Sequence, residues 1–159
     1  MKISTKGRYA LRMLLDMLQQ ETDGYIALKD IARRQQISKK YLEQIAMQLT
    51  QAGVLVTSRG QQGGYRLVGR AEDYTVADVL RITEGSMRPV ACMDESPNTC
   101  ERCTFCLTLP VWEGLDAVVQ AYLASITLRD ILDGKAPERA RRQAQAIRGG
   151  EKADGKSRE

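Results

Sequence analysis

The chain has 159 residues, enough for one ordinary domain with an extension, and 43% of them are hydrophobic, which suffices for a core. No apolar run approaches the roughly 18 residues that span a membrane, and the N-terminus lacks a signal peptide's apolar block, so we expect a cytoplasmic protein. The absence of histidine excludes catalytic triads built on Ser–His or Cys–His pairs. Nothing else supplies a nucleophile–base pair, so we expect neither an enzyme nor a small-molecule substrate.

The net charge of +4 conceals an uneven distribution. Residues 1–70 carry twelve basic against five acidic side chains, residues 71–134 carry four against eleven, and residues 135–159 carry eight against four. A basic first part beside an acidic second part indicates a nucleic-acid face on the first part alone. A chance placement of solvated charges is the alternative interpretation.

Hydrophobic periodicity and turn residues divide the chain into helices and two short strands. The predicted elements are helices over residues 5–20, 28–35 and 39–52, strands over 54–57 and 65–68, and helices over 75–84 and 110–133. Ser38 and Thr75 are the predicted N-caps of the third and fourth helices. Residues 135–159 are polar, charged and glycine-bearing, which predicts a flexible charged tail.

Two short helices followed by a two-stranded hairpin predict a winged helix-turn-helix, with the helix-turn-helix over residues 28–51 and the wing over 54–68. A helix of this kind fits the major groove of DNA, and a basic loop reaches the neighbouring minor groove. The predicted fold class is therefore mainly α with a small β-wing, and the predicted partner is double-stranded DNA.

The outward face of the second short helix carries residue types that suit DNA. Lys39 and Lys40 suit phosphates, and Gln44 can pair with adenine. Glu43 is repelled by phosphates, so its place on this face indicates that it accepts a hydrogen bond from a cytosine amino group. The full set of candidate DNA-contacting residues is Ser38, Lys39, Lys40, Tyr41, Glu43, Gln44, Arg59 and Gly60. An ordinary solvated helix face and an ordinary glycine-rich turn are the alternatives.

All four cysteines fall within fifteen residues, as Cys92-x7-Cys100-x2-Cys103-x2-Cys106. Such clustering predicts a shared site, and thiolates select zinc, copper(I) or iron–sulfur clusters. Zinc ribbons separate two Cys-x2-Cys pairs by a longer stretch, whereas three cysteines at x2 spacing are similar to the first ligands of a bacterial ferredoxin motif. We therefore favour an iron–sulfur cluster over structural zinc and over thiol chemistry without metal.

A series of motifs runs through the DNA-reading region and the helices that flank it. They are Lys6-Gly7-Arg8-Tyr9-Ala10, Ser38-x-x-Tyr41-Leu42-Glu43-Gln44-Ile45, Gly53-Val54-Leu55, Arg59-Gly60-x-x-Gly63-Gly64-Tyr65-x-Leu67 and Thr75-Val76-x-Asp78-Val79. Together they resemble the IscR family of winged-helix repressors, which includes iron–sulfur, nitric-oxide and cysteine-metabolism regulators. The resemblance covers residues 1 to about 134.

The resemblance implies a homodimer crossed through long C-terminal dimerisation helices, residues 109–134, with two heads on a palindrome-like operator. It implies that Glu43 governs sequence choice and that Arg59 enters the minor groove. It also implies cysteine ligands in the loop over residues 86–108. Residues 1–134 would then form one regulator domain.

The cysteine spacing departs from the C-x5-C-x5-C pattern usual among the iron–sulfur sensors, and no histidine is present. Cys92 and Cys106 are expected at the outer ligand positions, Cys100 at the middle one and Cys103 as a fourth ligand. All-cysteine ligation leaves [2Fe–2S] and [4Fe–4S] open; the family favours [2Fe–2S], and zinc is less favoured. The predicted function is a repressor that senses cluster status, redox or nitric-oxide stress. The alternative is a cluster-free repressor of the same fold that senses through thiols, zinc or a partner enzyme.

Overall fold

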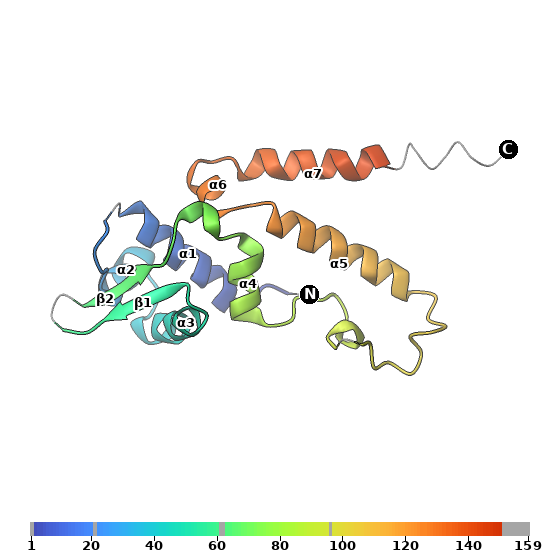
Figure 1. Ribbon diagram of the computed structural model, residues 1–159, viewed down its shortest axis with the longest axis horizontal. Helices are drawn as coiled ribbons and strands as arrows, with labels where there is room; N and C mark the ends of the chain where they lie inside the picture. The colour runs from blue at the N-terminus through green and yellow to red at the C-terminus, as the bar shows by residue number, and fades with distance from the viewer. Residues whose placement is uncertain (1, 21, 61–62, 96, 151–159) are drawn as a thin grey trace.

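Seven α-helices and one β-hairpin make up most of the computed structural model, which describes residues 2–20, 22–60, 63–95 and 97–150 (Figure 1). The helices are α1 (Thr5–Gln19), α2 (Leu28–Gln35), α3 (Lys39–Gln51), α4 (Val76–Glu84), α5 (Leu109–Ala124), α6 (Leu128–Leu132) and α7 (Ala136–Gly150). The strands are β1 (Leu55–Ser58) and β2 (Gly64–Leu67), and short 3-10 turns occupy Ala71–Asp73 and Ala91–Met93. This arrangement confirms the predicted class, mainly helical with a small two-stranded sheet.

Helix α1 is the centre of the packing. It contacts α2, α3, α4, α6 and β2, and Figure 1 shows α2, α3 and α4 around it. Ala10, Met13 and Leu14 on α1 are fully buried. Full burial of a side chain such as Leu14 contributes about 1.5–3 kcal/mol, so α1 supplies much of the stability of the domain.

The helix-turn-helix consists of α2, a three-residue turn and α3. Gln36 takes the left-handed conformation (φ +54°), which ends α2 without a glycine. Ile37 then enters the core, and Ser38 begins α3 by accepting a hydrogen bond from the N–H of Tyr41 at 3.2 Å. The sequence prediction of both helices and of the Ser38 cap is confirmed.

A buried ion pair joins α1 to the helix-turn-helix. The Asp16 carboxylate is almost fully buried and lies 2.6 Å from the Arg34 guanidinium, and the Gln35 amide donates to it at 2.9 Å. Burial raises the pKa of Asp16, but the hydrogen bonds from Arg34 and Gln35 and the charge of Arg34 outweigh burial and hold this pKa below its ordinary value. The pair therefore orients α2 against α1, and both oxygens of the Asp16 carboxylate accept hydrogen bonds.

The predicted single helix over 110–133 is wrong in its second half. Helix α5 ends at Ala124, and Thr127 begins α6 with a capping box in which the Thr127 hydroxyl and the Asp130 carboxylate satisfy each other's backbone N–H groups. Thr75 and Asp78 form the same box at the start of α4. The two helix starts pair as an isolated antiparallel bridge, Thr75 opposite Thr127.

The predicted flexible tail over 135–159 is helical over α7, and residues 151–159 lie outside the described residues. Helix α7 forms because Pro137 occupies its first turn and alanines, which have the highest helix propensity, recur along it. Arg139 ties it to Asp130 of α6 through a 3.3 Å ion pair. Within the described ranges, no helix is both long and apolar enough to cross a membrane.

We expect Asp16→Asn to lower the free energy of unfolding by about 3 kcal/mol at neutral pH, because it leaves the Arg34 guanidinium without its carboxylate. The folded-state pKa of Asp16 is lowered, so its stabilisation is complete above the unfolded-state pKa of about 3.9 and is lost as the pH falls through the folded-state value. The stability difference between wild type and variant should therefore be constant near neutral pH and shrink below about pH 4.

Urea unfolding at a fixed protein concentration measures this difference. Asp30→Asn is the matched control, because Asp30 pairs with Arg33 at the surface, where such a pair contributes at most about 1 kcal/mol. Equal losses in the two variants would contradict the role assigned to Asp16.

Candidate nucleic-acid interface and cysteine loop

The first turns of α3 present an exposed polar face. Ser38, Lys39, Lys40, Glu43 and Gln44 are all exposed there. The Lys39 ammonium lies 3.3 Å from the Glu43 carboxylate, with both side chains at least half exposed. The pair therefore keeps the Glu43 carboxylate beside the Lys39 ammonium on the solvent-exposed face of α3.

Tyr41 is placed differently from the other predicted contact residues. It is half-buried, and its ring meets the Tyr9 ring edge to face at 5.7 Å. The Arg12 guanidinium lies over the Tyr9 ring at 5.2 Å. Tyr41 therefore packs α3 against α1, although it was predicted among the DNA-contacting residues.

The wing is an antiparallel hairpin in which Leu55 pairs with Leu67 and Ser58 with Gly64. Ile26, just before α2, adds an isolated bridge to Tyr65 through two backbone hydrogen bonds of 2.9 Å. Gly64 is required for this approach, because a Cβ there would lie 2.3 Å from the Ile26 carbonyl oxygen. The hairpin is therefore attached to the start of the helix-turn-helix by backbone hydrogen bonds.

Arg59 and Gly60 are exposed at the end of the hairpin, and Gly60 has a positive φ of +109° that favours glycine. Gln61 and Gln62 of the predicted loop lie outside the described residues. The exposed tip and the start of α3 border one open groove of about 420 Å3. Its lining includes Lys39 and Glu43 from α3, Lys29 from α2, and Ser58, Gly60 and Gly63 from the wing.

Lys29 is a residue of this groove that the sequence analysis missed. It is exposed on the first turn of α2, where helix N-termini favour anions. A basic residue directly after the first residue of a predicted helix-turn-helix is the signal that could have found it.

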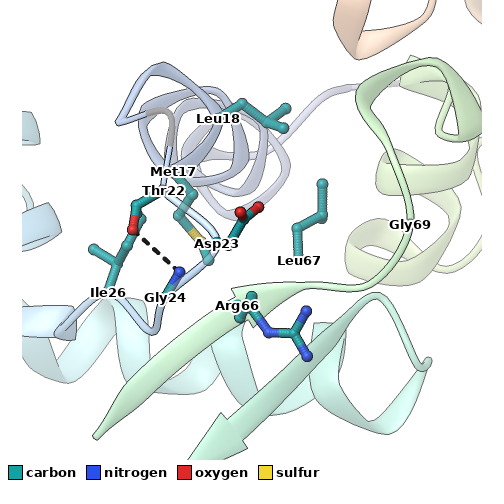
Figure 2. A pocket seen from close by; sticks show the side chains of 9 residues that line it. All are labelled: Met17, Leu18, Thr22, Asp23, Gly24, Ile26, Arg66, Leu67 and Gly69. Carbon is teal, nitrogen blue, oxygen red and sulfur yellow. Dashed lines mark hydrogen bonds between the residues drawn. The ribbon is translucent and has the colours of Figure 1, made fainter. Parts of the chain in front are cut away.

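A second hollow, of about 250 Å3, lies between α1 and strand β2 of the wing (Figure 2). It is lined by Met17 and Leu18 of α1, Thr22, Asp23 and Gly24 of the following connection, Ile26, and Arg66, Leu67 and Gly69 from the wing side. Figure 2 shows the Thr22 hydroxyl accepting a hydrogen bond from the Gly24 N–H, at 3.1 Å, at its edge. Its charged lining residues are Asp23 and Arg66, and its apolar lining residues lie where α1 packs against β2.

The segment between α4 and α5, which carries the four cysteines, leads into the end of α5 that lies away from the hairpin (Figure 1). Cys92 is exposed in the 3-10 turn, and the other three are half-buried in a series of turns that runs into α5. The Cys103 N–H donates to the Cys100 carbonyl at 3.0 Å, and the Leu109 N–H donates to the Cys106 carbonyl at 3.2 Å. All four thiols are free. Among the described residues, no three potential ligand side chains converge on one point.

Cys106 has a perturbed thiol. Its sulfur lies 3.4 Å from the Thr108 hydroxyl. That contact, the backbone N–H groups of Thr108 and Leu109, and the charge of Arg102 together lower the pKa of Cys106 against the opposing effect of burial. Thiolate is the form that binds metal, so this donor set fits a thiolate-ligated group, although the loop must close for the four sulfurs to meet.

An exposed apolar stripe follows the cysteines along α5. Val111, Leu115 and Val118 recur at helical spacing and are 60%, 41% and 39% exposed. Phe105 and Leu107 extend the stripe into the loop, and Leu107 is 94% exposed. A contiguous exposed apolar surface of this kind marks an interaction site.

Comparison with known proteins agrees with this architecture. Residues 3–134 match the Rrf2 family model, described as iron-dependent transcriptional regulator. The chain is 39% identical over 132 residues to protein rrf2 of Nitratidesulfovibrio vulgaris, covering 83% of this chain and 87% of that one. It is 35% identical over 148 residues to the regulator IscR of Photobacterium profundum, covering 92% and 85%.

Solved structures point the same way. The IscR structure of T. potens is similar with a TM-score of 0.67 and 36% identity, covering 84% of this chain and 88% of that one. CymR of B. subtilis, titled the global cysteine regulator, is similar with a TM-score of 0.61 and 34% identity, covering 82% and 95%. The winged fold and the match over residues 3–134 together establish that this chain belongs to the Rrf2 family of transcriptional regulators, which are not enzymes, and that it is a homologue of IscR and CymR.

Proposed function

We propose that this protein is a dimeric repressor that reads DNA with α3 and the wing and senses its signal through a cysteine-held iron–sulfur cluster. The observation that carries the proposal is the open groove between α3 and the wing, bordered by exposed basic residues on one end of the domain, with four free thiols at the other end. The match to the Rrf2 family model supports DNA binding in general.

In this proposal α3 enters the major groove and Arg59 enters the adjacent minor groove. Lys29, Lys39 and Lys40 contact phosphates, which supplies affinity that does not depend on sequence. Ser38 and Gly60 allow close backbone approach, and Gln44 reads adenine. Tyr41 supports α3 from behind, since its ring is already packed on α1.

Glu43 is proposed to select the operator. Its carboxylate attracts no phosphate, and in the free protein it is paired with Lys39 at 3.3 Å. On the operator it accepts a hydrogen bond from a cytosine amino group, whereas guanine at that position presents only acceptor atoms and thymine an acceptor and a methyl group. Discrimination therefore comes from penalising wrong sequences, as in other interfaces that use repulsion for specificity.

We expect Glu43→Ala to weaken discrimination between operator and unrelated DNA by about tenfold or more, since a good base contact is worth about 1–3 kcal/mol. Affinity for unrelated DNA should stay the same or rise, because Lys39 is released from its pair. Titration of labelled duplexes at fixed salt concentration measures both affinities. A uniform loss of affinity on all sequences would contradict this role.

Arg59→Ala is the matched contrast for that experiment. Removing an exposed cation from the wing tip should weaken operator binding by about 1–3 kcal/mol. An unchanged operator affinity would exclude Arg59 from the interface.

The sensing site is proposed to use Cys92, Cys100 and Cys106, with Cys103 as the fourth ligand because no histidine exists to replace it. Four thiols suit an iron–sulfur cluster, [2Fe–2S] favoured over [4Fe–4S], which when bound supplies a centre that redox agents or nitric oxide alter. The lowered pKa of Cys106 favours its ligating thiolate form. Zinc, or thiol chemistry in the manner of the cysteine-metabolism regulators, is the second candidate, since the chain is also similar to CymR, titled the global cysteine regulator.

We expect protein purified without air to be brown and to contain iron and acid-labile sulfide in equal amounts. Cys103→Ser should lower the cluster content per chain severalfold if Cys103 is a ligand, because a hydroxyl is a much poorer ligand for iron than a thiolate. Thr104→Ser, beside it in the same turns, is the control. Elemental analysis and visible absorption read the result. A colourless wild-type protein with one zinc per chain would establish the second candidate instead.

A second copy of the chain is the proposed occupant of the apolar stripe on α5. The stripe is continuous over Val111, Leu115 and Val118, and a palindrome-like operator requires two heads in one assembly. Burying such a stripe against its copy removes the exposed apolar surface from water.

We expect Leu115→Glu to convert the dimer to a monomer, because a charge at the centre of an apolar contact is costly to bury. Light scattering after gel filtration measures the mass, and Glu113→Gln on the same exposed helix is the control. A dimer that survives Leu115→Glu unchanged would place the interface elsewhere.

A further inference from the structure

The carboxylate of Glu84 caps a helix to which it does not belong. Its Oε1 atom accepts hydrogen bonds from the Ser4 N–H at 3.1 Å, the Ser4 hydroxyl at 2.8 Å and the Gly7 N–H at 3.0 Å. Backbone N–H groups at the start of a helix have no partner within the helix, and a carboxylate there also meets the positive end of the helix dipole. Glu84 thus satisfies the first turn of α1 from the last turn of α4.

Gly7 makes this contact possible. A Cβ at residue 7 would lie 2.3 Å from Glu84 Oε1 and 2.8 Å from the Leu80 side chain, distances that no packed side chain tolerates. Gly7 is buried in the first turn of α1, where it faces α4. The first turn of α1 is therefore built to receive α4.

The position of Glu84 in the chain joins two parts of the molecule. It is the last residue of α4, and Gly85, with φ +74°, ends the helix and leads directly into the cysteine loop. The first part of that loop is held against the protein by the buried Met87 and Met93 on either side of Cys92. At the other side, α1 carries Tyr9, which packs on Tyr41 of α3.

We infer that Glu84 is a positioning residue that transmits the state of the cysteine loop to the DNA-reading helix α3. A loop that closes around its ligated group displaces the last turn of α4. Hydrogen bonds weaken steeply beyond about 3.5 Å, so a displacement on the order of 1 Å breaks the cap. The released first turn of α1 then shifts Tyr9 against Tyr41. This inference rests on the proposed function, since it assumes that the loop changes state.

The test compares wild type with Glu84→Ala, Glu84→Gln and Glu72→Gln. Glu84→Ala removes the acceptor, and Glu84→Gln keeps a carbonyl oxygen but loses the charge. Glu72→Gln makes the same chemical change at an exposed glutamate that pairs with Arg70 and Arg129. For each protein, operator affinity is measured with the cluster present and after its removal by chelation, and amide hydrogen exchange is measured over the first turn of α1.

We expect Glu84→Ala to reduce the ratio of the two affinities by about fivefold, a scale typical of residues that carry coupling. Glu84→Gln should give an intermediate ratio, and Glu72→Gln the wild-type ratio. Exchange at Gly7 should quicken in Glu84→Ala and stay slow in Glu72→Gln. A residue with a merely structural role would lower both affinities equally, so an unchanged ratio in Glu84→Ala and Glu84→Gln would overturn the inference.

The measurements distinguish a failure of the proposed sensing function from a failure of the positioning role of Glu84. If the wild-type protein carries no cluster, the proposed sensing function is wrong. The Glu84 variants without cluster still test the cap, because amide exchange at Gly7 and operator affinity show whether Glu84 positions the DNA-reading helix α3. Unchanged exchange and unchanged affinity in those variants would overturn the positioning role itself.

Discussion

The packing of α1 against five other elements is the constraint on which the rest of the structure depends. The helix-turn-helix, the wing strand β2, α4 and α6 all pack on this one helix, so each is located relative to the others through it. The apolar side chains of an amphipathic helix must be covered by other elements for the fold to be stable. Because all these elements cover α1, the DNA-reading elements share one core with α4, which leads to the cysteines. Val79 of α4 and Leu128 of α6 belong to the same hydrophobic cluster as Ile45 of α3.

Local chemistry explains which elements the sequence predicts well. Ser38 and the Thr75–Asp78 pair are side-chain caps that act within three residues, so they can be recognised without the fold, and both occur as expected. The break after α5 has the same signature in Thr127 and Asp130, but the apolar periodicity of the surrounding residues conceals it. Helix α7 escapes prediction because its charge and glycine content are typical of tails, although its alanines favour a helix.

Contacts between distant residues explain what the sequence could not provide at the candidate site. The exposed face of α3 follows from helical spacing, and its lysines, Glu43 and Gln44 are exposed as expected, whereas Tyr41 is half-buried against α1. The place of Lys29 in the groove and the bridge between Ile26 and Tyr65 depend on how the hairpin returns to α2, which no local pattern encodes. The cysteine spacing predicts a shared site, but the separation of the thiols in the folded loop depends on turns that spacing alone does not specify.

The direct packing of α4 on α5 has a consequence for insertions and deletions in the segment between them. Leu80 and Met87 on one side and Leu123 on the other share a small core, which holds the start of that segment and the C-terminal part of α5 without any residue between the cysteines. The free-energy cost of closing a flexible loop grows only with the logarithm of its length, by about 0.6 kcal/mol for each doubling. Residues between the cysteines can therefore be gained or lost at little energetic cost, which makes an unusual spacing compatible with an unaltered DNA-reading head.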